Sequence, residues 1–243
     1  MAALSASQAT HWRSSGPYLP TIASKAALLE ETRLFLVALG QHNLETTSQI
    51  LLDTTLVQRS RETRKTILEI IRTRLVRWNP PAWVQHDLVS FANEASLEAL
   101  RAALLLHVPR QDRVLYDFVQ EVVFPRWHSG ESQITVADVQ KFFDATQADH
   151  PEIARWSFET RLRLARGMLA TLRDYGLLKG TVQKQVVLPV IPEQVVQHAI
   201  RLLDAEGIAQ TQMADHPDWC VWLWSPAQAQ VAIERFFKQE HIG

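Results

Sequence analysis

QRSRETRKTILEIIRTRLVRW, residues 58–78, combines seven Arg and Lys residues with apolar residues at helical spacing. At about 3.6 residues per turn, five apolar residues share one stripe, which predicts a helix buried on that side: Ile67, Ile70, Ile71, Leu75 and Trp78. The side chains predicted to point away from the stripe are basic: Arg61, Arg64, Lys65 and Arg72. A core-facing helix with an outward basic face predicts an anionic partner.

The segments on both sides of this stretch predict further helices. Apolar residues recur at helical spacing within residues 22–41, 44–56, 81–93, 96–108 and 112–125. Asn79-Pro80-Pro81 ends the basic helix and Pro109 is expected to end a later one, because proline cannot donate into a helical ladder. We therefore predict a helical bundle over residues 22–125. Residues 1–21, rich in Ala, Ser, Thr and Pro, predict a flexible arm.

The pattern changes after residue 125. Thr135 and Ser157 are placed to cap two helices, the second of which runs to about Gly176. Residues 182–191 are rich in β-branched side chains and predict a strand, with WCVWLW at 219–224 as its partner. Two more helices are expected at 192–206 and from residue 226. The fold is thus predicted to be mainly α, with a helix-turn-helix or winged-helix-like domain at 126–243 and at most a small β-hairpin.

Composition narrows the class of protein. The chain has 243 residues, of which 47% are hydrophobic and 21% charged, as is typical of a globular protein. Its longest apolar runs, about 12 residues, fall short of the roughly 20 that span a bilayer. Because the N-terminus also lacks the order of a secretory signal, we expect a cytoplasmic protein with no membrane partner. Cys220 is the single cysteine, which excludes an intrachain disulfide.

The sequence offers no pattern typical of an enzyme. Its nine histidines are scattered, with no pair at i, i+4 and no HExxH motif. Neither a GxSxG motif nor a glycine-rich phosphate loop is present. We therefore expect no catalytic residue, no metal, no cofactor and no small-molecule substrate.

Charge is unevenly distributed along the chain. The total of −1 divides into +3 for residues 1–110, −1 for 111–180 and −3 for 181–243, whereas residues 55–80 alone carry +5. A local field of that kind binds phosphate, and hydroxyls and free N–H groups at a helix start add donors. The residues predicted to contact the phosphates of a nucleic acid are Arg59, Ser60, Arg61, Thr63, Arg64, Lys65 and Arg72, with Arg161, Arg163 and Arg166 as a supporting site.

Several segments together carry a resemblance to a known family. They are LLDTTLVQRSRETRKTILEIIRTRLVRW (51–78), with Leu56, Gln58, Arg59, Ser60, Thr63 and Arg74-Leu75, then YDFVQEVV (116–123), residues 138–143, and WSFETRLRL through LRDYGLL (156–178). In order and spacing they resemble the BrxA family of BREX bacteriophage-exclusion systems, over about residues 15–180. The resemblance implies a mainly helical, non-enzymatic DNA-binding accessory factor of a defence island, whose N-terminal part is similar to NusB-like helical domains. It implies no catalytic residue.

Two alternatives to duplex DNA stay open. If Trp222 and Trp224 shared an exposed face of a strand, they would form a patch for docking another protein. The chain would then be an assembly scaffold that binds other BREX components, with its basic helix on an acidic protein surface. The NusB-like resemblance instead predicts binding to single-stranded RNA.

Overall fold

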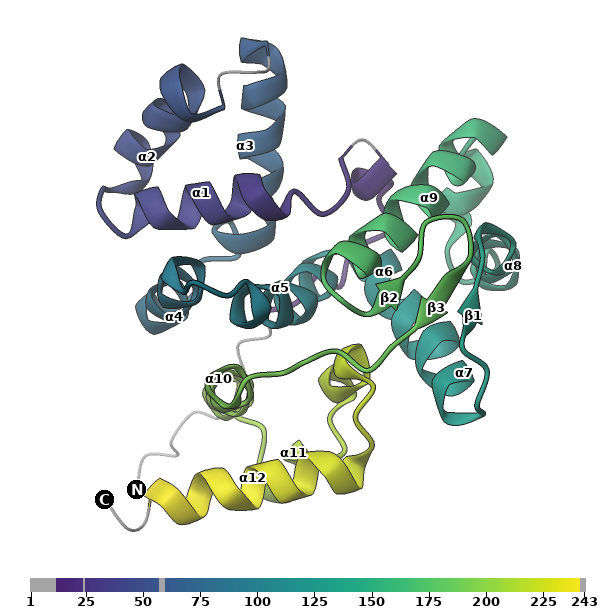
Figure 1. The fold of residues 1–243 in the computed structure, drawn as a ribbon. Helices are drawn as coiled ribbons and strands as arrows, with labels where there is room; N and C mark the ends of the chain where they lie inside the picture. Colours follow the sequence, from purple (N-terminus) through teal and green to yellow (C-terminus); the bar gives the residue numbers. More distant parts are fainter. Residues whose placement is uncertain (1–11, 24, 57–59, 241–243) are drawn as a thin grey trace, which may run out of the picture.

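The basic stretch forms helix α3 (Arg61–Leu75), which packs against the helices that precede it (Figure 1). The computed structural model describes residues 12–23, 25–56 and 60–240. A 3-10 turn, η1 (Thr21–Ala23), precedes α1 (Leu29–Leu39) and α2 (Leu44–Ile50), which continues as one π-helical turn, η2 (Leu51–Thr55). Of the predicted apolar stripe, Ile67, Ile71 and Leu75 are buried against this group and the centre of the molecule, whereas Ile70 and Trp78 are half-buried.

Helix α5 (Glu98–Gln111) follows α4 (Ala82–Asn93) and occupies the centre of the molecule. Eleven of its fourteen residues are buried, and it contacts α3, α4, α6, α10 and η5. A helix that is buried all round is typical of a core position. The prediction that Pro109 ends this helix is wrong, because the helix continues to Gln111. Pro109 and Arg110 are both buried within this last turn.

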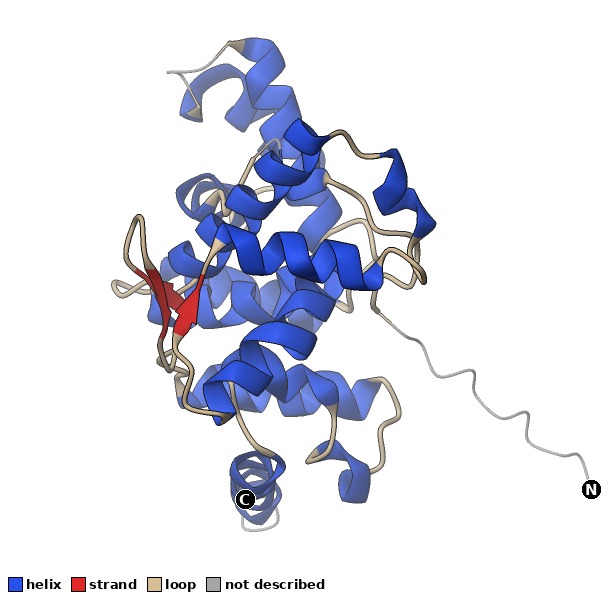
Figure 2. Cartoon of the chain, turned by 90° about the vertical axis from the view of Figure 1, so that its right-hand side faces the viewer, coloured by secondary structure: helices blue, strands red, loops and turns tan. Residues whose placement is uncertain are grey.

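The next part begins with a helix, followed by a strand, two helices and a hairpin. Helix α6 (Arg113–Phe118), the π-helical turn η3 (Val119–Val123) and α7 (Phe124–His128) are continuous, so the predicted boundary after residue 125 falls inside a helical stretch. The remaining elements are β1 (Gln133–Ile134), α8 (Val136–Thr146), η4 (Pro151–Arg155), α9 (Phe158–Asp174), β2 (Leu178–Lys179) and β3 (Lys184–Val186). The strands form a small antiparallel sheet in the order β1-β3-β2, which is drawn in red in Figure 2.

The predicted pairing of residues 182–191 with WCVWLW is wrong. Strand β3 lies in the first segment but pairs with β1 and β2, whereas the second segment lies mostly in a 3-10 helix, η5 (Pro217–Trp222). Trp219 and Trp222 are 2% and 0% exposed, and their indole N–H groups donate to the carbonyls of Met213 (2.6 Å) and Ala102 (3.2 Å). Trp222 and Trp224 therefore do not share an exposed strand face.

Three more α-helices lie in the rest of the described residues: α10 (Glu193–Ala205), α11 (Gln210–Met213) and α12 (Pro226–Glu240). Helix α10 packs back onto α4 and α5, so the C-terminal helices contact the N-terminal half of the molecule. Within the described residues, every helix is too short or too polar to cross a membrane. The same residues contain no cluster of three or more His, Cys, Asp or Glu side chains that could hold a metal ion.

Residues 12–21, part of the predicted arm, are packed against several elements. Tyr18 is 2% exposed, its ring stacks on His150 with centroids 3.6 Å apart, and its hydroxyl donates to Asp117 (2.7 Å). The backbone N–H of Trp12 donates to Glu206 (3.2 Å). This segment therefore ties α6 to the region before α9 and to the C-terminal helices. Residues 1–11 of the predicted arm lie outside the described residues.

Candidate nucleic-acid interface

Helix α3 begins with a serine cap at an exposed position. The Ser60 hydroxyl accepts a hydrogen bond from the N–H of Thr63 (3.2 Å) and lies 2.9 Å from the Thr63 hydroxyl. Such a cap satisfies one of the free N–H groups of the first turn and fixes where the helix starts. The remaining free N–H groups and the helix dipole favour an anion at this end. Both predicted hydroxyl residues are thus placed at the helix start.

Only part of the predicted basic face of α3 is outward. Arg61 and Lys65 have side chains 62% and 57% exposed, with Asp53 at 3.7 Å and Glu62 at 3.8 Å, respectively. Exposed pairs of this kind contribute about 0–1 kcal/mol, so both cations can exchange their carboxylate for a phosphate. Arg59 lies outside the described residues.

The other arginines of α3 differ from the prediction. Arg64 and Arg72 are half-buried, and Arg64 donates to the carbonyl of Leu56 (3.3 Å). Arg74 is 6% exposed and donates to the carbonyls of Lys25, Ala26 and Ala27 at 3.0–3.3 Å. The prediction that Arg64 and Arg72 point away from the core is therefore only partly right. The outward charge of α3 is smaller than its sequence count.

Helix α9 begins in the same way as α3. The Ser157 hydroxyl accepts from the N–H of Thr160 (3.2 Å) and lies 3.0 Å from the Thr160 hydroxyl. Arg163 is 60% exposed with Glu159 at 3.9 Å, and Arg166 is also exposed. Arg161 is only 17% exposed, because it binds Asp144 (2.9 Å), Gln147 (2.6 Å) and the carbonyl of Ile153 (3.2 Å). Of the three predicted arginines, Arg163 and Arg166 are accessible and Arg161 holds α9 to the preceding elements.

The two helix starts share one sequence motif, which charge and helical spacing alone do not reveal. Residues 60–64 read SRETR and residues 157–161 read SFETR. In each copy the serine caps the helix and the final arginine donates to a carbonyl eight residues earlier, Leu56 in one case and Ile153 in the other. A comparison of the two arginine-bearing segments with each other would have revealed this repeat.

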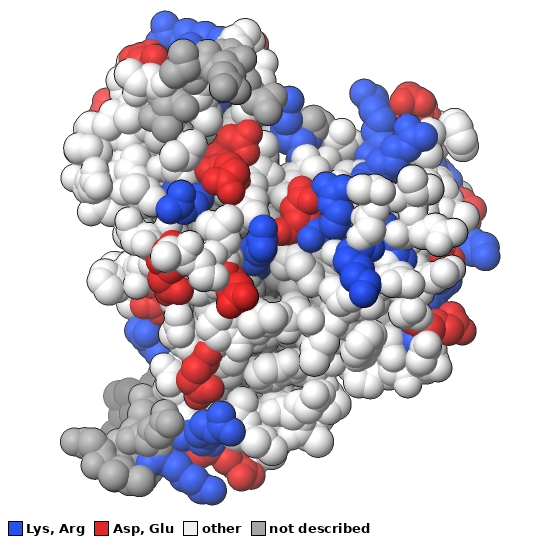
Figure 3. Space-filling model, viewed as in Figure 1, with Lys and Arg blue, Asp and Glu red and all other residues white. Residues whose placement is uncertain are grey.

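The copies differ in their second residue. Arg61 in α3 corresponds to Phe158 in α9, and the Phe158 side chain is 74% exposed. A large aromatic side chain at an exposed helix start is suited to contact with a partner. Figure 3 shows Lys and Arg side chains over the part of the molecule that contains α9 and the sheet, and again at the top of the lobe formed by α1–α3.

Positive charge also affects a lysine of the sheet. Partial burial lowers the pKa of Lys184 in β3 from its ordinary value, and the nearby guanidinium of Arg173 lowers it further. The Lys184 ammonium donates to the carbonyl of Thr181 (2.7 Å) in the hairpin that follows α9.

Gly180 in this hairpin has φ +93°, and a Cβ there would lie 2.2 Å from the Gln183 carbonyl oxygen, so the turn requires glycine.

Comparison with known proteins shows similarity to a protein family, to a curated relative and to a solved structure. The family model described as BrxA matches residues 16–202. A curated relative, "BREX protein BrxA" of Bacillus cereus (strain H3081.97), is 26% identical over 118 residues, which are 48% of this chain and 59% of that protein, so the match spans little more than half of the relative. A crystal structure of an uncharacterized protein from Magnetospirillum magneticum has a TM-score of 0.67 and 15% identity, and the alignment covers 86% of this chain and 100% of that one. This structural likeness concerns the fold alone.

Proposed function

The chain belongs to the BrxA family, and from this membership we propose that it is a DNA-binding accessory protein of a BREX phage-defence system. The name of the Bacillus cereus relative supports the BREX assignment. In this proposal the protein catalyses no reaction, binds duplex DNA in the cytoplasm and works beside other BREX components.

The observation that carries the DNA proposal is the repeated serine-capped helix start. Two helices, α3 and α9, each present free backbone N–H groups and a pair of hydroxyls at their start. Each also carries two accessible cations, Arg61 and Lys65 in the first two turns of α3, and Arg163 and Arg166 in the second and third turns of α9. These are the groups that bind phosphate oxygens. In helix-turn-helix proteins the second helix enters the major groove by its N-terminal residues, and both α3 and α9 are second helices of a helix pair.

The surroundings of α9 support the same proposal. The elements α7, β1, α8, α9, β2 and β3 follow the order found in a winged helix: a helix, a strand, two helices and a hairpin. In that fold the second helix of the pair, here α9, is the recognition helix. Phe158 at the start of α9 offers an apolar surface for a thymine methyl group or a base edge. Since most of the remaining groups suit phosphate, sequence preference should be slight and affinity should fall steeply with salt.

The scaffold alternative has less support. Its docking patch required an exposed face containing Trp222 and Trp224, but Trp222 is fully buried and Trp224 packs against the core. The RNA alternative differs from the DNA proposal in a measurable way, because it predicts that single-stranded RNA outcompetes duplex DNA.

A double charge reversal in α3 tests the proposal. The residues to reverse are Arg61 and Lys65, because their side chains are exposed. Arg64 is left unchanged, since it donates to the Leu56 carbonyl and reversing its charge would disturb the fold. We expect Arg61→Glu with Lys65→Glu to lower duplex affinity by about tenfold or more at low salt, since two phosphate contacts become repulsive. The measurement is a fluorescence titration of a labelled duplex across a salt series, with unlabelled single-stranded RNA as competitor.

The matched control is Arg235→Glu with Lys238→Glu in α12. These residues are also exposed, Arg235 also has one carboxylate partner (Glu193 at 3.5 Å), and α12 lies at the opposite end of the molecule from α3 in Figure 1. The control should bind duplex DNA as the parent protein does. Equal affinity of the α3 variant and the parent would remove α3 from the interface, and stronger binding to RNA would favour the RNA alternative.

A further inference from the structure

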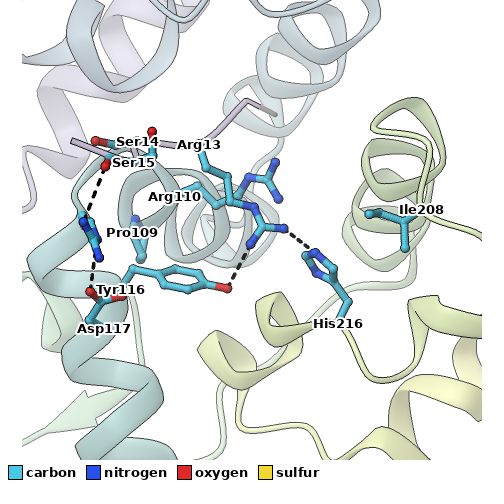
Figure 4. Close-up of a pocket in the computed structure, with 10 residues that line it drawn as sticks. Arg13, Ser14, Ser15, Pro109, Arg110, Tyr116, Asp117, Ile208 and His216 are labelled. Carbon is cyan, nitrogen blue, oxygen red and sulfur yellow. Dashed lines mark hydrogen bonds and ion pairs between the residues drawn. The ribbon is translucent and has the colours of Figure 1, made fainter. Parts of the chain in front are cut away.

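Some of the positive charge of this protein is used inside the fold. A cavity of about 550 Å³ lies between the N-terminal segment, α5, α6 and the C-terminal helices (Figure 4). Arg13, Arg110 and Arg113 line this cavity, and all three pair with carboxylates: Glu206, Asp218 and Asp117. These arginines therefore join parts of the chain and offer no unpaired charge to an anionic partner.

The hairpin formed by β2 and β3 differs, because its cations are not paired with carboxylates. Residues 175–192 contain two lysines, Lys179 and Lys184, and neither Asp nor Glu. Lys179 is exposed and forms no ion pair with any described residue. Besides partial burial, the nearby Arg173 guanidinium lowers the pKa of Lys184. Asp174, a carboxylate that also acts on Lys184, is paired with Arg173 (2.7 Å).

The loop of this hairpin is tight and projects into solvent. Leu178 pairs with Val186, and Lys179 pairs with Gln185 in the antiparallel register, so residues 180–183 connect the strands. All of residues 179–183 are exposed, and Val182 is 92% exposed, which is the largest value among the large apolar side chains described. Val182 therefore contributes nothing to the core, and the loop presents an apolar tip beside a lysine.

The hairpin lies beside α9, the helix whose start carries the proposed phosphate contacts (Figure 1). The minor groove of B-DNA is about 6 Å wide, which is too narrow for an α-helix of about 10–12 Å but suits a tight loop. Its negative potential attracts cations, and several DNA-binding proteins insert apolar side chains into it. A loop with an apolar tip and an unpaired lysine has the shape and the charge for this groove.

We propose that the β2–β3 loop enters the minor groove of duplex DNA, next to the stretch of major groove that α9 occupies. Val182 lies against the floor of the groove, and Lys179 binds a phosphate at its edge. This inference rests on the proposed DNA-binding function and adds a second contact element to it.

The position of Val182 predicts a slight preference among base pairs. In a G·C pair the guanine N2 amino group occupies the minor groove, whereas an A·T pair presents only acceptors there. An apolar side chain on the groove floor leaves that amino group without a hydrogen-bond partner. The loop should therefore favour A·T over G·C pairs, by about threefold or more.

Three duplexes of equal length test the minor-groove assignment: one of A·T pairs, one of G·C pairs, and one with inosine in place of guanine. Inosine keeps the major-groove acceptors of guanine but lacks the N2 amino group, so the groups presented differ only in the minor groove. In fluorescence titrations of the whole chain, we expect the A·T and inosine duplexes to bind about threefold or more tightly than the G·C duplex. Equal affinity for the inosine and G·C duplexes would overturn the assignment.

A matched pair of substitutions locates the contact. Val182→Asp places a carboxylate at the loop tip, and Val231→Asp places one on α12, where the parent side chain is also exposed (59%). We expect Val182→Asp to weaken duplex binding by about tenfold and Val231→Asp to leave it within about twofold, with both melting temperatures unchanged. Equal affinity of the two variants would remove the hairpin from the interface.

The lysine contact has its own readout. Lys179→Gln should make the slope of log affinity against log salt less steep by about 0.9, whereas Lys238→Gln, at an exposed lysine of α12, should leave the slope unchanged. An unchanged slope in Lys179→Gln would refute the phosphate contact. If the parent protein bound no duplex, the proposed function would fail together with this inference. If the parent bound DNA and only the α3 charge reversal weakened binding, this inference alone would fail.

Discussion

Arginine has two opposite roles in this protein. Arg74 and Arg110 are buried and bind carbonyls or carboxylates, while Arg61 and Arg163 are mostly exposed and have only weak partners. The guanidinium of Arg110, together with that of Arg13, holds the pKa of Asp218 below its ordinary value, although burial alone would raise that pKa. Charge counts from sequence cannot separate the two roles, because burial is decided by residues far away in the chain.

A second buried polar group leads to a prediction on pH. His107 and His198 are buried with their Nε2 atoms 2.8 Å apart, and His198 Nδ1 lies 2.8 Å from Asp87. Both imidazoles can be neutral in this arrangement. His107 Nε2–H then donates to His198 Nε2, and His198 Nδ1–H donates to the Asp87 carboxylate. Burial lowers the pKa of both histidines. The pKa of His107 lies well below its usual value, because the nearby His198 and Arg110 lower it further.

The sign of the pH effect follows from these lowered pKa values. Below about pH 6.5 the unfolded chain takes up protons on both histidines, while the folded protein does not, so acid favours unfolding. We expect the free energy of unfolding, from urea titrations, to be about 1–3 kcal/mol lower at pH 5 than at pH 7.5. His107→Gln should reduce this difference, since its amide can still donate to His198 but does not titrate. An unchanged difference in the variant would show that this pair is not the source.

At the scale of elements, a substitution at the serine cap of α9 can change the affinity for DNA without lowering the stability of the fold. In Ser157→Asp the carboxylate still caps α9, and it interacts favourably with the helix dipole, by about 0.3–1 kcal/mol. The same charge repels a phosphate at that position. We expect an unchanged or slightly higher unfolding free energy, measured in urea, and duplex affinity lower by about tenfold.

Ser157→Asn is the control for this change, because asparagine caps a helix about as well as aspartate but carries no charge. It should match the parent protein in both measurements. If Ser157→Asp bound the duplex as tightly as Ser157→Asn, no phosphate would lie at the start of α9. A drop in stability in Ser157→Asp would instead indicate a lost cap.

Most helices could be predicted from sequence, and so could a strand within residues 182–191, which contains β3, whereas β1, β2 and the strand pairing could not. The stripe with Ile67, Ile71 and Leu75, and the caps at Thr135 and Ser157, depend on local spacing that a sequence shows directly. The WCVWLW segment depends on distant partners, since Trp222 donates to Ala102, 120 positions away. A short apolar run has no period that distinguishes a strand from a buried helical segment.

The candidate site was predictable to a similar extent. Ser60, Arg61, Thr63 and Lys65 lie at the exposed helix start where the sequence placed them. The half-burial of Arg64 and the role of Arg161 as a tie could not be foreseen, because they depend on how α3 and α9 sit on the elements before them. The SxETR repeat is visible in the sequence, but only the structure shows that the serine of each copy caps a helix.

At the scale of the whole molecule, α5 and the segment of residues 12–21 join parts that are separate in sequence. Helix α5 contacts α3 on one side and α10 and η5 on others, and Arg110 of α5 pairs with Glu206 and Asp218 in the C-terminal region. The acidic C-terminal third is thus partly neutralised inside the protein. Positive charge remains accessible on α3 and α9, which are held by one common core (Figures 1 and 3).

A common core that holds two similar helices predicts that one duplex is bound by both. The slope of log affinity against log salt is about −0.9 for each phosphate contact, so neutralising two residues should make the slope less steep by up to about 1.8. We expect this change from Arg61→Gln with Lys65→Gln, and again from Arg163→Gln with Arg166→Gln. The fourfold variant should show the sum of the two changes, at a stoichiometry of one duplex per chain. If the fourfold variant bound DNA no more weakly than one of the double variants, only one helix would contact DNA. If the parent protein bound two duplexes per chain, the two helices would bind DNA separately.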